Sequence, residues 1–176
     1  MVKLYGPTNF APVVMESARR ASETLDGSRY QILLIITDGA ISDMADTKRA
    51  IISASFLPLS IIIVGVGDDD FGNMDELDSD DCLLSFEGRQ AQRDIVQFVP
   101  MRQFLRGPVT GLEGERVMWL LAKEVLAEVP LQLTSYMEMN RISPKQSDDS
   151  NSELEMVFAP TAQDGQRLYP SAPLES

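Results

Sequence analysis

Apolar residues gather in three runs that predict the strands of a sheet. Residues 30–37 and 60–67 are almost uninterrupted apolar stretches, each ending in a threonine or in glycines. Such uniform runs are typical of parallel strands that are covered on both faces. Residues 93–100 form a third, shorter run that ends at a proline, and we predict a third strand there.

Amphipathic stretches between and after these runs predict helices. Residues 10–27 and 42–56 place apolar side chains at helical spacing, and a short helix is expected around 71–77. Residues 113–137 predict one long helix with a kink at Pro130, because proline cannot donate the backbone hydrogen bond of a helix interior.

This alternation predicts an α/β fold with a doubly wound, mostly parallel sheet. In such sheets the functional site lies beyond the carboxyl ends of the strands. We call this edge the strand-end rim, and the residues that the sequence places there are Thr37, Asp38, Gly39, Gly65 and Gly67. We expect the folded domain to cover residues 1–141. Residues 142–176 are polar and rich in proline, serine and aspartate, which indicates a disordered tail.

The composition of the chain excludes several kinds of partner and catalytic site. The 176 residues include 15 basic and 27 acidic side chains, a formal net charge of −12, which disfavours nucleic acid and anionic lipid as partners. The chain has no histidine, so histidine-dependent catalysis and histidine-ligated zinc are excluded. A single cysteine, Cys82, and the lack of a signal or membrane-spanning pattern indicate a cytoplasmic protein.

Three motifs suggest ligand chemistry, and two of them fail on inspection. Asp38, at the end of a buried strand, could serve as a metal ligand, a helix cap or a turn residue. The Gly65-x-Gly67 pair lacks the third glycine of a dinucleotide loop and is followed by three aspartates that would repel a pyrophosphate. The same acidic stretch does not match a calcium loop, because placing Gly72 sixth puts Gly67 first, where a carboxylate is needed.

Five segments, in their order and spacing, resemble one known domain. They read YGPTNFAPVV, LLIITDGAISDM, SIIIVGVG, ELDSDD and RDIVQFVP. Together they resemble the von Willebrand factor A-like domain at the C-terminus of the copines. Copines are intracellular proteins whose two C2 domains bind phospholipid when calcium is present, and whose A-like domain recruits protein partners. The resemblance implies a divalent-cation site in which Thr8 and Asp38 are metal ligands.

The resemblance is incomplete at its first element. The family pattern begins with a strand followed by D-x-S-x-S, and only seven residues precede Thr8. The letters DDSNS at residues 148–152 fit the pattern but follow no strand, and we interpret them as a chance match. We therefore expect a partial domain that binds magnesium or calcium weakly, because two oxygen donors leave most of the coordination shell to water. We also expect the strand at Tyr30–Thr37 to be an exposed edge through which the chain self-associates.

The function implied by this resemblance is that of a non-catalytic interaction module. Intracellular proteins would dock at the strand-end rim, and direct lipid binding is not expected without C2 domains. Recruitment to the plasma membrane would occur as part of a longer copine. Two alternatives stay open: a non-functional or dominant-negative fragment of a longer copine, and a nucleotide-binding α/β enzyme, against which the missing phosphate loop and missing base argue.

Overall fold

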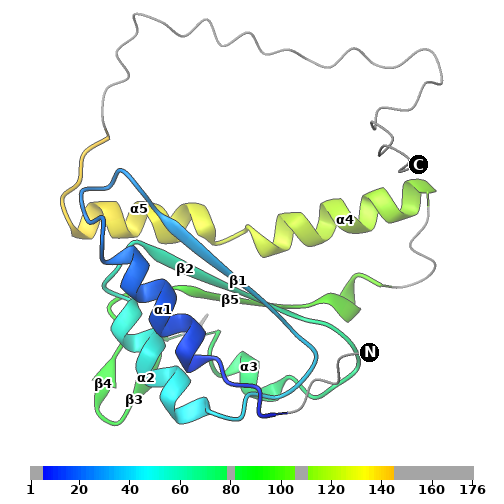
Figure 1. The fold of residues 1–176 in the computed structure, drawn as a ribbon. Coiled ribbons are helices and arrows are strands. Elements are labelled where there is room, and N and C mark those ends of the chain that lie inside the picture. Colours follow the sequence, from blue (N-terminus) through cyan, green and yellow to red (C-terminus); the bar gives the residue numbers. More distant parts are fainter. Residues whose placement is uncertain (1–5, 79–81, 106–110, 145–176) are drawn as a thin grey trace, which may run out of the picture. The chain divides into compact units, whose positions relative to one another are not determined.

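A parallel three-stranded sheet is the centre of the fold (Figure 1). The computed structural model describes residues 6–78, 82–105 and 111–144. Strand β1 (Gln31–Thr37) pairs with β2 (Leu59–Gly65), which pairs with β5 (Val96–Pro100). All three strands run in the same direction. The predicted α/β class and the three predicted strands are therefore confirmed.

Helices lie on both sides of the sheet, as a doubly wound fold requires (Figure 1). Helices α1 (Ala11–Ala21) and α2 (Met44–Ala54) pack together on one side. Helices α4 (Gly111–Val125) and α5 (Val129–Met139) lie on the other. The smaller elements are listed here: α3 (Gly72–Asp75), a 3-10 turn (Met101–Gln103), and a hairpin of β3 (Ser85–Phe86) and β4 (Arg89–Gln90).

The main apolar core lies between the sheet and helices α1, α2 and α3. Strand β2 is buried along its whole length, and Ile61 and Ile63 contribute its core side chains. Ile51, Ile52 and Ser55 of the α2 region are all buried. Because every residue of β2 is covered, this strand fixes the position of its two neighbours.

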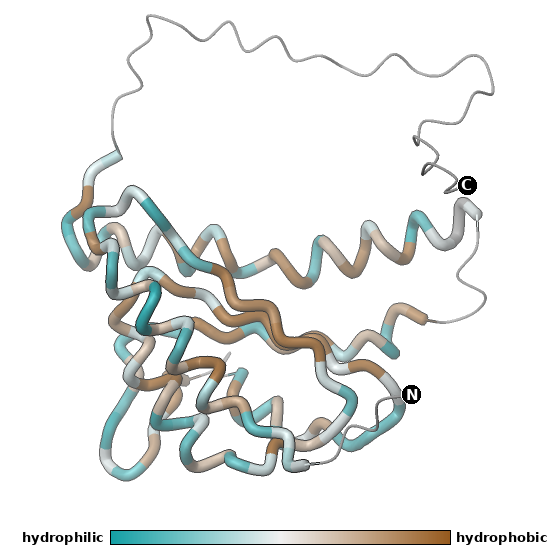
Figure 2. Tube along the Cα trace, in the orientation of Figure 1, coloured by the Kyte–Doolittle hydropathy of each residue, from teal (hydrophilic) through white to brown (hydrophobic). Residues whose placement is uncertain are grey.

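Strand β1 is covered on one face alone, which corrects the prediction that both faces are buried. Leu33 and Ile35 pack against the core, whereas Ile32, Leu34 and Ile36 are 46%, 54% and 65% exposed. Figure 2 shows the resulting apolar path along β1 and β2. An unbroken apolar run identifies a strand but does not tell which of its faces is covered. Among the residues that the structure describes, the strand lies at an edge of the sheet, as expected.

The predicted long helix with a kink is wrong, because the chain forms two separate helices. Helix α4 ends at Val125 and α5 begins at Val129, with Pro130 in its first turn. Proline suits the first turn, where its missing N–H costs no hydrogen bond, so it starts a helix here rather than bending one. The β3–β4 hairpin was not predicted, since its strands are two residues long and mostly polar.

Two expectations lie outside the described residues. The tail that was expected to be disordered at 142–176 falls there from residue 145 onward, and the chance DDSNS match at 148–152 falls there entirely. Among the helices that the structure describes, none combines the length and apolar character needed to cross a bilayer.

Candidate functional site

The strand-end rim is formed where β1 and β2 end side by side. Thr37 and Gly65 are partners in the parallel register, and Val66 N donates a 2.8 Å hydrogen bond to Thr37 O. Thr37 is buried, and its hydroxyl donates to Gly39 O at 3.2 Å, which shapes the turn. Asp38, between these two residues, is exposed. The rim therefore presents the Asp38 side chain to solvent on a well-supported turn.

Thr8 is held in the loop before α1 by Ser42, which follows β1. Thr8 N donates to Ser42 Oγ at 3.1 Å, and Ser42 N donates to Thr8 O at 2.8 Å. Since Ser42 and Asp38 belong to the same connection between β1 and α2, the structure brings both predicted site residues to the same loop region. The two residues proposed as metal ligands thus share one end of the sheet.

Asp43 is the residue that fixes this region. It stands just before helix α2, and its two carboxylate oxygens accept hydrogen bonds from Phe10 N at 2.9 Å and Ala11 N at 3.0 Å, at the start of α1. Thr47 Oγ1 donates to the same carboxylate at 3.0 Å. A negative side chain at a helix N-terminus satisfies unpaired N–H groups and complements the helix dipole.

An acidic loop after β2 adds further negative charge to the rim. Asp68, Asp69 and Asp70 are all exposed. A Cβ placed on Gly39 would lie 3.3 Å from Asp69 Oδ2, so this carboxylate reaches the turn that carries Asp38. The position of Asp69 was missed because the sequence showed an acidic loop without showing which turn it covers.

Phe71 and Arg102 support the acidic loop. The Phe71 ring packs against Gly65, where an added Cβ would lie 3.0 Å from the ring, so glycine is needed at the strand end. The Arg102 guanidinium lies over the same ring, 5.7 Å from its centre, and donates to Asp69 O at 3.1 Å. The Phe71 ring and the Arg102 guanidinium therefore hold the acidic loop against the rim.

The oxygen donors of the rim do not fit a tight cation site. Hard cations such as magnesium and calcium require about six or more oxygen ligands. Both carboxylate oxygens of Asp43 are engaged by donors, and Ser42 Oγ accepts from Thr8 N. Thr8 and Asp38, with Asp69 near by, supply too few ligands among the described residues for high affinity.

A second acidic group, not foreseen from the sequence, lies at the outer edge of β5. Carboxylate oxygens of Asp78, Asp94 and Glu128 lie within 4.8 Å of one another, an arrangement that could hold a metal ion. Asp78 Oδ2 accepts from Phe98 N at 2.9 Å, and Asp94 Oδ1 accepts from Val96 N at 3.1 Å. These carboxylates therefore satisfy backbone donors of β5. Their wide separation in the sequence hid the group.

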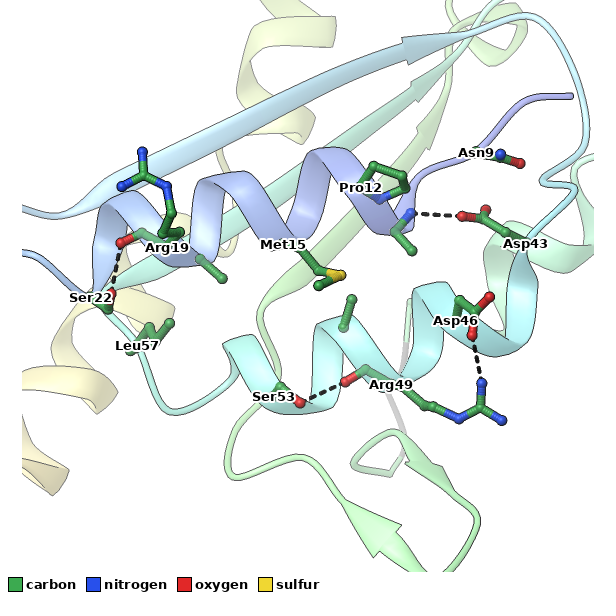
Figure 3. Close-up of a pocket in the computed structure, with 13 residues that line it drawn as sticks. Asn9, Pro12, Met15, Arg19, Ser22, Asp43, Asp46, Arg49, Ser53 and Leu57 are labelled. Carbon is green, nitrogen blue, oxygen red and sulfur yellow. Dashed lines mark hydrogen bonds and ion pairs between the residues drawn. The ribbon is translucent and has the colours of Figure 1, made fainter. Parts of the chain in front are cut away.

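A groove of about 760 Å³ runs between α1 and α2 and begins next to the rim (Figure 3). Pro12 and Met15 give it an apolar wall, and Asn9 and Asp43 lie at the rim end. Arg19 lies at the far end, and its hydrogen bond and charge lower the pKa of Glu16 to about 2. Hydrogen bonding to Glu87 raises the pKa of Arg49 on the α2 side. The cations along this groove are thus engaged by carboxylates of the same chain.

Comparison with known proteins identifies the family. A model of the copine family matches residues 1–145. Nicotinic receptor-associated protein 1 of Caenorhabditis elegans is 59% identical over 150 residues, which cover 84% of this chain and 24% of that protein. Nicotinic receptor-associated protein 1 of Caenorhabditis briggsae is 58% identical over 146 residues, which cover 82% of this chain and 23% of that protein. The chain spans about a quarter of the length of these relatives. With a family match over most of its length, the chain belongs to the copine family.

Proposed function

We propose that this chain is a non-catalytic protein-interaction module of a copine-type, calcium-dependent phospholipid-binding protein. Its partners dock at the strand-end rim, in the cytoplasm. Family membership supports the interaction role, and the names of both relatives describe association with a nicotinic receptor. We propose a nicotinic receptor, or a protein bound to one, as a partner of this chain.

The single observation that supports the rim as a docking surface is the exposed Asp38 directly after the end of strand β1. A functional side chain gains precision when it is mounted on a rigid element. Thr37 and Ser42 hold the loop that carries Asp38 through hydrogen bonds. With the exposed aspartates at 68–70, Asp38 makes this end of the sheet negative. A partner surface with arginine or lysine side chains is therefore the complement that we propose.

We expect Asp38→Asn to weaken receptor binding by about fivefold or more, on the scale of ~1 kcal/mol for an interface charge. The measurement is co-precipitation of detergent-solubilised nicotinic receptor by the immobilised chain, quantified over a range of receptor concentrations. Glu138→Gln is the matched control, because it removes one exposed carboxylate from α5. Equal binding by both variants and the parent chain would rule out docking through Asp38.

The rim metal site of the family is expected to be weak in this chain. Calorimetric titration with magnesium, manganese or calcium should show no saturable binding tighter than about millimolar, because most ligands would be water. Asp94→Asn separates the rim from the Asp78, Asp94 and Glu128 group, since it removes a carboxylate from the latter alone. Micromolar binding that Asp38→Ala abolishes and Asp94→Asn preserves would contradict this expectation.

Membrane recruitment is proposed to come from the calcium-dependent lipid binding of a longer copine. The net charge of −12 opposes contact with anionic lipid headgroups. Vesicles of phosphatidylserine and phosphatidylcholine should therefore not sediment this chain, with or without calcium. Calcium-dependent co-sedimentation of the chain would show that it carries a lipid site of its own.

A further inference from the structure

Helix α1 ends in two adjacent arginines, and a serine follows two residues after the second one. Residues 19–22 read Arg-Arg-Ala-Ser, which places Arg19 and Arg20 three and two positions before Ser22. Serine kinases of the basophilic class recognise arginines at these two positions, because the charge pattern beside an acceptor separates their substrates from other chains. Arg19 and Arg20 are the only adjacent arginines in the sequence, so no other serine or threonine has this spacing. The motif therefore singles out Ser22.

Ser22 is accessible and stands at the boundary of the helix. It is exposed and comes directly after Ala21, the last residue of α1. Its hydroxyl donates a 2.7 Å hydrogen bond to Arg19 O (Figure 3). Residues 22–30 form neither helix nor strand before β1 begins. A kinase must bring the acceptor hydroxyl into line with the phosphate of ATP. Only the final turn of α1 has to open for Ser22 to reach that position.

Weak contacts hold this final turn. Ala18 and Ala21 are its side chains that pack against the core, and alanine buries little apolar surface. Val14, which is 1% exposed, anchors an earlier turn of the helix instead. Arg19 and Arg20 pair with exposed glutamates at 2.7 to 2.9 Å, and exposed ion pairs add little stability. The end of α1 can therefore open locally while the rest of the fold stays intact.

We propose that Ser22 is a phosphorylation site for a basophilic serine kinase. The γ-phosphoryl group of magnesium-bound ATP passes to Ser22 Oγ. A P–O bond forms to Oγ, the bond from the same phosphorus to the bridging oxygen of ADP breaks, and the hydroxyl proton passes to the catalytic aspartate of the kinase. The site lies at the opposite end of α1 from the strand-end rim, roughly 16 Å away along the helix axis. It is therefore independent of docking at the rim.

A phosphate at this position disturbs the end of α1. It carries a charge of roughly −1.5 to −2 at neutral pH. It also lacks the proton that Ser22 Oγ donates to Arg19 O. Negative charge is unfavourable at the C-terminus of a helix, and Glu23 adds a second carboxylate there. Both nearby arginines are already held by glutamates, so the phosphate competes with existing pairs. Phosphorylation therefore loosens the end of α1, where Ser22 lines the far end of the groove.

Incubation of the full chain with magnesium, ATP and the catalytic subunit of cyclic-AMP-dependent protein kinase tests the acceptor. The chain should gain one phosphoryl group, which tandem mass spectrometry should place on Ser22. Ser22→Ala should gain none, and Ser22→Thr, which keeps a hydroxyl, should still be modified. Ser53→Ala is the matched control and should behave like the parent chain. Ser53 is also exposed and donates to the carbonyl of Arg49, but it lacks the arginine pair (Figure 3).

The two arginines are tested together. Arg19→Gln combined with Arg20→Gln should lower kcat/KM of the kinase for the chain by about tenfold or more, because both charges are recognised. Circular dichroism checks that this variant folds. Equal rates for this variant and the parent chain would overturn the proposal. Phosphate on a residue other than Ser22, or phosphorylation of the heat-unfolded chain alone, would overturn it as well.

Amide exchange of the phosphorylated chain measures the structural consequence. Ser22 N donates to Ala18 O at 2.9 Å, and Glu23 N donates to Arg20 O at 3.2 Å. Both amides should exchange severalfold faster after phosphorylation, while the amides of residues 10–11 at the start of α1 keep their rates. Unchanged exchange of the Ser22 and Glu23 amides would contradict the loosening of α1.

Discussion

Replacing Arg93 by methionine is expected to cause the largest loss of stability, about 3 to 5 kcal/mol in the free energy of unfolding. Arg93 is 5% exposed, and its guanidinium donates to Gln132 O at 3.0 Å, to Leu59 O at 2.8 Å and to Leu57 O. It thereby joins the start of β2 to helix α5. A methionine would leave these buried carbonyl groups without their donor.

Two tyrosines complete the surroundings of Arg93. Its guanidinium lies 5.3 Å from the centre of the Tyr136 ring and 5.8 Å from that of Tyr30, and it donates to Tyr30 Oη at 3.1 Å. Tyr30 in turn shares a 2.8 Å hydrogen bond with Ser60 Oγ. Burial raises the pKa of Tyr136, so this phenol stays neutral at physiological pH. The variant therefore disturbs three elements of the fold together.

Urea denaturation measures this effect. Arg20→Met is the control, because the Arg20 side chain is 64% exposed and its pair with Glu16 should contribute less than about 1 kcal/mol. Arg93→Lys should fall between the parent and Arg93→Met, since lysine keeps the charge but not the planar fork of donors. If Arg93→Met unfolds at the same urea concentration as Arg20→Met, the buried guanidinium does not hold α5 to the sheet.

The second large effect is expected for Asp43→Ala, a loss of about 2 to 3 kcal/mol in the free energy of unfolding that arises at the rim end of the fold. The change removes the acceptor for Phe10 N, Ala11 N and Thr47 Oγ1. The loop that contains Thr8 would then be held to the connection after β1 mainly through Ser42. Asp43→Asn should cost less, because its amide keeps one oxygen acceptor.

Amide exchange separates this local effect from a general loss of stability. Phe10 and Ala11 amides should exchange much faster in Asp43→Ala than in the parent chain, while amides of β2 change only with global stability. Asp46→Ala serves as the control, since Asp46 is exposed and pairs with Arg49 on the same helix. Unchanged exchange at Phe10 and Ala11 would show that Asp43 is not the cap of α1.

The sequence predicted the strands and the first two helices because their patterns are local. Residues 31–37 and 59–65 are apolar runs, and such runs identify strands without long-range information. The covering of β1 was not predictable in this way, since it depends on what packs against Ile32, Leu34 and Ile36. The position of Pro130 was visible, but the choice between a kink and a new helix depends on tertiary packing.

The sequence predicted where the candidate site lies, but it predicted only some of the residues that form it. Asp38 was placed at the rim by the rule that parallel strands end at one edge. Asp43 contacts residues 10–11 and Asp69 lies near Gly39. These contacts join segments that are far apart in the sequence, so a local pattern does not predict them. Arg93 was not singled out because arginine is rarely buried, and its burial depends on carbonyl groups from two distant segments.

Residue-resolved amide exchange tests most directly whether β1 is the open edge of the sheet. In dilute solution the Leu34 and Ile36 amides should exchange rapidly, while Leu33, Ile35 and the amides of β2 exchange slowly. Uniformly slow exchange along β1 would contradict this account, because the outward amides of the strand would then be covered.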